Sequence, residues 1–212
     1  MDDIRCKRKE GPVLLVEGQN DCHVVLAIKE VYKLSVTFDI HDCGSDAQAL
    51  SALNALISSS TEPRVVGLVI DADSPNLAGR WTSILNKLEG YGYPLPAIPE
   101  PKGTIVEPIS DYPRLGFWLM PDNQIDGMLE DFCIDMIDAK AVATVEQCLQ
   151  IAVADGCATF KPAHRRKALL HTYLAWQDKP GRQIEHAITQ LSLRPDTATA
   201  QAFADWLTAL FR

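Results

Sequence analysis

The chain has 212 residues and a formal net charge of −8, with 47% hydrophobic and 23% charged residues. This balance suits a soluble globular protein of one large domain, or one domain with an extension. No apolar stretch approaches the roughly 20 residues of a membrane span, so no membrane partner is expected. The polar N-terminal residues lack a signal-peptide core and predict a cytoplasmic protein.

The first half of the chain alternates short apolar runs with amphipathic segments. Core strands are predicted at residues 12–16, 36–40, 64–70 and 115–120, and an edge strand at 104–107. Helices are predicted after the first three strands, the third of them spanning residues 77–88. This order indicates right-handed crossovers and an α/β, Rossmann-like fold with a mainly parallel sheet of about four strands flanked by helices.

Two of the apolar runs stop at carboxylates. Glu17 ends the first strand, whereas Asp71 and Asp73 follow the third. Because the carboxyl ends of parallel strands share one edge, these acids are expected to meet there. Clustered carboxylates suit Mg²⁺ or Mn²⁺. The alternatives are a dipole-stabilised acid at a helix start for Glu17 and a capped turn for the aspartates.

The ordered pair Glu17-Gly18 and Asp71-Ala72-Asp73 resembles the toprim domain, the metal-binding module of topoisomerases, primases and OLD-type nucleases. The resemblance covers roughly residues 12–132 and implies a toprim-like sheet. The whole chain most resembles small standalone toprim proteins related to OLD-type nucleases. Such proteins are often paired with a separate ATPase, which the resemblance implies as a partner.

The same resemblance implies further site residues. Asp21 matches the extra acid of the nuclease branch and would be a second-metal ligand, its alternative role being a helix N-cap. Glu130 resembles a further acid on a helix after the fourth strand, and we expect it to approach the cluster more closely than Asp131. First-turn dipole stabilisation is the alternative for Glu130, and Asp122 and Asn123 are rival candidates.

From about residue 139 the predicted elements are all helical, punctuated by prolines. We therefore divide the chain into a core of residues 1–138 and a helical extension of residues 139–212 packed on it. A basic run in this extension could contact phosphates, or could be a solvated helix start. Its candidate nucleic-acid contacts are Lys161, Arg165 and Arg166, joined by Lys102 from a proline-rich loop. Lys167 is the candidate for stabilising charge in a transition state.

The cysteines and histidines offer no recognisable ligand spacing. None of the six cysteines forms a CxxC pair, so buried, reduced thiols are expected. No metal role is assigned to any histidine.

Together these observations predict a Mg²⁺- or Mn²⁺-dependent nuclease acting on DNA or RNA, with Glu17 as a ligand or general base. The chain lacks a GxxxxGK[ST] loop and is not expected to hydrolyse ATP in the usual way. The alternative is a non-hydrolytic metal-binding module that works through a partner ATPase or nucleic acid. The net acidity requires local positive charge wherever nucleic acid binds.

Overall fold

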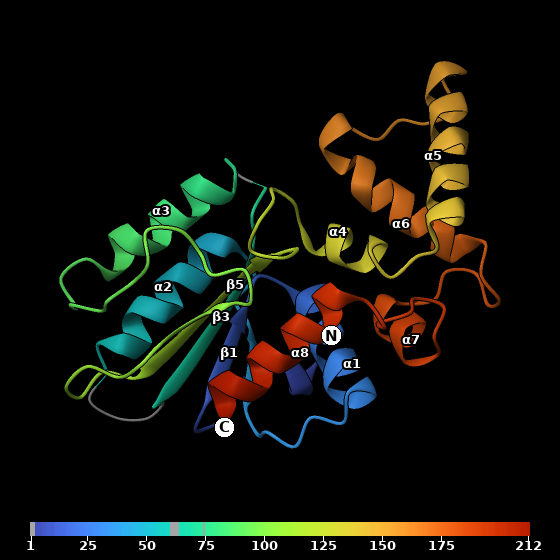
Figure 1. Cartoon of the computed structure of the whole chain (residues 1–212). Coiled ribbons are helices and arrows are strands. Elements are labelled where there is room, and N and C mark those ends of the chain that lie inside the picture. The colour runs from blue at the N-terminus through green and yellow to red at the C-terminus, as the bar shows by residue number, and fades with distance from the viewer. Residues whose placement is uncertain (1–2, 60–63, 74) are drawn as a thin grey trace.

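The computed structural model describes residues 3–59, 64–73 and 75–212, which fold around a five-stranded sheet (Figure 1). The strands are β1 (Val13–Val16), β2 (Asp39–Asp42), β3 (Val65–Asp71), β4 (Thr104–Val106) and β5 (Arg114–Met120). They lie in the order β2-β1-β3-β5-β4, with β4 antiparallel to β5 and all other pairs parallel. The α/β class and the mainly parallel sheet are as predicted. The strand expected at 36–40 begins only at Asp39, where its ladder with β1 starts.

Helices cover both faces of the sheet. On one face lie α2 (Asp46–Ile57) and α3 (Leu77–Leu88), and on the other lie α1 (Gln19–Val31) and α8 (Ala198–Phe211) (Figure 1). Alternate β1 residues point to opposite faces, so Val13 and Leu15 join the α2–α3 core while Leu14 and Val16 join the other. All four are fully buried, which explains why β1 is apolar throughout.

Two glycines let α8 approach the sheet closely. Gly67 of β3 and Gly116 of β5 are paired in register. A Cβ atom at Gly116 would lie 2.4 Å from Leu210 Cδ2, and one at Gly67 would lie 2.9 Å from the same atom. The paired glycines therefore form the groove that receives Leu210, which is fully buried.

The remaining helices lie outside these two layers. They are α4 (Leu129–Ile134), α5 (Ala139–Ala154), α6 (Arg165–Ala175) and α7 (Ile184–Thr189), with short 3₁₀ turns η1 (Ile4–Cys6) and η2 (Pro162–His164). In Figure 1, α5 and α6 lie side by side and extend away from the sheet, whereas α7 packs near α1. Among the described residues, no helix combines the length and apolar character required to cross a membrane.

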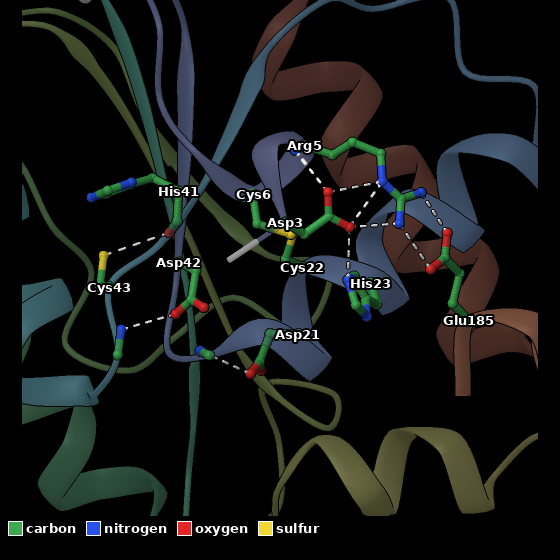
Figure 2. Close-up of a disulfide and its surroundings, with 12 residues drawn as sticks. Asp3, Arg5, Cys6, Asp21, Cys22, His23, His41, Asp42, Cys43 and Glu185 are labelled. Carbon is green, nitrogen blue, oxygen red and sulfur yellow. Dashed lines mark hydrogen bonds and ion pairs between the residues drawn. A yellow bond between two sulfur atoms is a disulfide. The ribbon is translucent and has the colours of Figure 1, made fainter. Parts of the chain in front are cut away.

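The cysteines differ from expectation. Cys6 and Cys22 form a disulfide, with their Cα atoms 5.9 Å apart (Figure 2). The prediction of reduced thiols was wrong for this pair, because folding η1 onto α1 brings together two residues that sequence spacing does not connect. Cys133 is a buried free thiol, and Cys148 and Cys157 are exposed ones.

Candidate acidic metal site

An acidic depression lies where β1 and β3 end and α4 begins. It encloses about 370 Å³. Its lining includes Glu17, Asp21, Asp71, Glu130 and Lys167. The fold thus brings together five residues that the sequence analysis had selected as candidates.

Hydrogen bonds to backbone amides fix two of the carboxylates. Glu17 Oε1 accepts a hydrogen bond from Asp71 N at 2.8 Å, which ties the end of β1 to the end of β3. Asp71 Oδ1 in turn accepts one from Leu129 N at 2.8 Å, at the first residue of α4. Each carboxylate therefore uses one oxygen to join neighbouring elements. Within the described residues, no hydrogen bond reaches the second oxygen of either side chain.

Asp21 has one satisfied and one unsatisfied oxygen. It lies in the first turn of α1, and its Oδ2 accepts a hydrogen bond from Gly18 N at 3.1 Å. Its Oδ1 is buried and has no hydrogen-bond partner among the described residues. Asp21 thus caps the helix with one oxygen and buries the other without a partner. An unpaired buried carboxylate oxygen is costly, and a bound cation would remove that cost.

The pKa values show how poorly this depression tolerates negative charge. Burial, reinforced by the charges of Asp21 and Glu17, raises the pKa of Asp71 to about 9. Burial, reinforced chiefly by the charge of Glu17, raises the pKa of Asp21 to about 7. Burial also raises the pKa of Glu17. Without a cation, the cluster will therefore retain protons near neutral pH.

Neighbouring acids on α4 have different partners. Glu130 is 4% exposed, faces the depression, and forms an ion pair with Lys167 Nζ at 3.3 Å. Asp131 accepts a hydrogen bond from Met128 N and pairs with Arg166 outside the depression. The two side chains diverge because successive helical residues are rotated by about 100°.

Other predicted acids lie outside the lining. Asp73 is exposed, although its charge contributes to raising the pKa of Asp71. The rival candidates shape the turn after β5. Asn123 Oδ1 accepts a hydrogen bond from Leu119 N, and Asp122 Oδ1 accepts from Gln124 N and Ile125 N. These bonds account for Asp122 Oδ1 and Asn123 Oδ1, whereas Asn123 Nδ2 is buried without a partner among the described residues.

A buried arginine beside the depression escaped the sequence analysis. Arg80 of α3 is 6% exposed; its Nε donates to the Asp71 carbonyl at 3.1 Å, and its Nη1 pairs with Asp46 at 2.6 Å. Its charge works against the rise in the Glu17 pKa. Arg80 holds the end of β3 in place, and no local pattern distinguishes it from a solvated helix residue.

The predicted basic residues have different surroundings. Arg165 pairs with Glu146 of α5, and Lys161 is exposed before η2. Lys102 is exposed two residues before the edge strand β4, so β5 separates it from β3. Lys167 is the single basic side chain among the described residues that line the acidic depression.

A family model described as "Protein of unknown function (DUF3226)" matches residues 11–212. Searches of the curated proteins and of the solved structures returned no significant match. The matched segment includes every strand of the sheet and every residue that lines the acidic depression. The chain therefore belongs to the DUF3226 family.

Proposed function

We propose that this protein is a cytoplasmic, Mg²⁺- or Mn²⁺-dependent nuclease with a toprim-like acidic site. The metal would be held by Glu17, Asp21, Asp71 and Glu130. Asp73, which is exposed beside the depression, would add a further carboxylate near the metal. The observation that carries the proposal is the buried, unpartnered Oδ1 of Asp21 in a depression that three other carboxylates line.

The donor types suit a hard divalent cation, although no three of these carboxylates have ligand atoms within 4.8 Å of one another in the described structure, so the side chains would move closer to bind one. Four carboxylates and one lysine line the depression, so it would carry a net charge of −3 if all of them were ionised. Carboxylate oxygens are the ligands that Mg²⁺ and Mn²⁺ favour. The amide bonds to Glu17 and Asp71 fix one oxygen of each and leave the other for a ligand. Such positioning reduces the freedom lost on binding.

The side chains themselves suggest a division of roles. A divalent cation would polarise the phosphate and lower the pKa of bound water. If Glu17 is not a ligand, it is suited to act as the general base at its second oxygen, because burial raises its pKa and its first oxygen is already bonded. The ammonium group of Lys167 could neutralise charge on a phosphate.

Nucleic acid would meet the protein along the start of α6. Lys161, Arg165 and Arg166 precede Lys167 there, and Lys102 would extend the contact across the sheet edge. Because the net charge is −8, these cations are needed to supply local positive potential. A separate ATPase is the proposed protein partner.

One observation favours the alternative of a non-hydrolytic metal-binding module. Arg165 and Arg166 are each paired with an acid of the protein itself, Glu146 and Asp131. These pairs leave less positive charge for a polyanion than the sequence suggests. In this alternative the metal would stabilise the strand ends, and the protein would act through a partner.

A cleavage assay tests the proposal. Supercoiled plasmid, single-stranded DNA and RNA are each incubated with purified protein and Mn²⁺ or Mg²⁺. We expect metal-dependent cleavage of at least one substrate, and its loss in Asp71→Asn and Asp21→Asn. Asp42→Asn is the matched control, since Asp42 ends the neighbouring strand β2 but does not line the depression. Metal binding without cleavage of any substrate would support the non-hydrolytic alternative.

A further inference from the structure

A second group of metal-type donors lies at the opposite side of the first turn of α1. Asp3, Cys6 and His23 each offer a ligand atom, and these atoms lie within 4.8 Å of one another. In the described part of the chain, no other trio of such donors meets this distance. Cys22 adds a fourth donor, because it is bonded to Cys6. Figure 2 shows Asp3 above His23, with the disulfide beside them.

We propose that reduction of the Cys6–Cys22 disulfide converts this group into a Zn²⁺ site with Asp3, Cys6, Cys22 and His23 as ligands. A dithiol reductant would supply two electrons and two protons, giving two cysteine thiols and an oxidised reductant. Zn²⁺ would then displace the two thiol protons, which pass to solvent. In the oxidised protein both sulfur atoms are engaged in the disulfide, and thiolate ligation is not available.

The chemistry of the donors selects zinc over magnesium. Two thiolates and an imidazole are the soft and borderline ligands that zinc prefers, and a carboxylate completes a tetrahedral set. By contrast, the acidic depression offers carboxylate oxygens alone. The two sites should therefore bind different metals even though Asp21 and Cys22 are neighbours. Figure 2 shows the Asp21 side chain pointing away from the disulfide.

The distances already approach those of a zinc site. His23 Nε2 and Asp3 Oδ2 are 3.2 Å apart. Bond lengths of about 2.1 Å place two such ligands roughly 3.4 Å apart on a tetrahedron. Two thiolates at about 2.3 Å from zinc would be roughly 3.8 Å apart, so opening the disulfide is the main change required.

The surroundings suit a closed structural site. Cys6 and Cys22 are buried, and the side chains of His23 and Asp3 are 13% and 19% exposed. Arg5 donates to Asp3 and also pairs with Glu185 of α7. Two thiolates, one carboxylate and Zn²⁺ sum to −1, and the Arg5 guanidinium, which is shared with Glu185, would offset part of this charge.

Cobalt and zinc titrations of oxidised and phosphine-reduced protein test the proposal. Co²⁺ added to the reduced wild type should produce a thiolate-to-cobalt charge-transfer band, and Zn²⁺ should abolish the band at one equivalent. The oxidised protein should give no band. His23→Ala leaves the disulfide intact and should weaken zinc binding by the reduced protein at least about tenfold.

Two further variants assign the sulfur ligands. Cys22→Ser should weaken the band, because one of the two thiolate ligands is lost, whereas Cys148→Ser/Cys157→Ser, which removes exposed thiols, should retain it in full. If Cys22→Ser fails to fold, His23→Ala still decides the question. The proposal is overturned if the reduced wild type gives no band, if the exposed thiols account for it, or if His23→Ala binds zinc as tightly as the wild type.

Discussion

The two oxygens of the Asp21 carboxylate have different surroundings. Oδ2 caps α1 through Gly18 N, while Oδ1 is buried without a partner in the described structure. A neutral amide of the same shape could keep the cap and remove the buried charge. Asp21 therefore offers a way to separate metal binding from structure.

We predict that Asp21→Asn raises the thermal midpoint of the metal-free protein at pH 8 and abolishes its rise on addition of Mn²⁺. The first effect follows from removing a charge that burial disfavours, and the second from losing a ligand. Differential scanning fluorimetry with and without Mn²⁺ measures both. Asp42→Asn should retain the wild-type metal response; an unaltered response in Asp21→Asn would place the metal elsewhere.

Stability of the metal-free protein should fall as pH rises from 5 to 8. Folding raises the pKa of Asp21 from 3.8 to about 7 and that of Asp71 from 3.8 to about 9. The folded state thus binds more protons than the unfolded state in this window, so protonation stabilises it and ionisation removes that stability. Each unit of difference corresponds to about 1.4 kcal/mol.

Urea unfolding at several pH values checks this dependence. Saturating Mn²⁺ should make the stability less dependent on pH, because the bound cation replaces the protons on the buried carboxylates. Folding lowers the pKa values of Asp3 and Asp46, so these two groups change the stability only at pH values below this window and do not obscure the result. A metal-free protein that is equally stable at pH 5 and pH 8 would contradict the electrostatic description of the depression.

At the scale of elements, α4 separates two roles on adjacent residues. We predict that Glu130→Gln weakens the stabilisation by Mn²⁺. Asp131→Asn should instead lower the free energy of unfolding by up to about 1 kcal/mol through loss of the ion pair with Arg166, because the amide oxygen can still accept from Met128 N. Thermal melts with a Mn²⁺ titration distinguish the two variants. If Asp131→Asn loses the metal response and Glu130→Gln keeps it, the assignment on α4 must be reversed.

The start of α6 carries two arginines that form ion pairs within the protein and that we propose as nucleic-acid contacts. Replacing Arg165 and Arg166 with Ala should weaken binding and reduce its salt dependence by about one unit of slope for each phosphate that the protein no longer neutralises. The change should also cost roughly 1 kcal/mol of stability, because both arginines pair with acids. Fluorescence anisotropy at several salt concentrations measures the binding, with Lys140→Ala on α5 as control. An unchanged salt slope would point to a partner protein as the source of affinity.

Much of the fold and part of the site could be predicted from sequence. Apolar runs mark buried parallel strands, and such strands converge at their carboxyl ends, so Glu17 and Asp71 could be paired without a structure. The position of Asp73 could not be predicted in this way. It lies two residues past the end of β3, where the loop and not the strand sets its direction, and it is exposed.

What escaped prediction depends on contacts between distant segments. Arg80 belongs to an amphipathic helix, and only tertiary packing shows that it is buried against Asp71 and Asp46. The Cys6–Cys22 bond depends on how η1 docks on α1, which no local pattern encodes. Both features require a three-dimensional arrangement that periodicity does not specify.

At the scale of the whole molecule, the last helix completes the core of the first strands. Leu210 of α8 fills the groove over Gly67 and Gly116, and Phe211 stacks on Phe38 at a centroid distance of 4.0 Å. Trp206 of α8 also packs on Trp118 of β5. A core of residues 1–138 separate from residues 139–212 remains a prediction from sequence, and these contacts make independent folding of the first segment unfavourable.

We therefore predict that Leu210→Ala lowers the free energy of unfolding by about 2–5 kcal/mol, because it leaves a cavity against two strands. Leu191→Ala is the control, since Leu191 is 60% exposed, and should change stability by less than about 0.5 kcal/mol.

Urea transitions followed by circular dichroism and by tryptophan fluorescence should coincide in the wild type. Trp81 and Trp118 lie in the cores on opposite faces of the sheet, so tryptophan fluorescence follows the unfolding of both faces. Separate transitions, or a 1–138 fragment that unfolds cooperatively on its own, would show that the two segments are independent units after all.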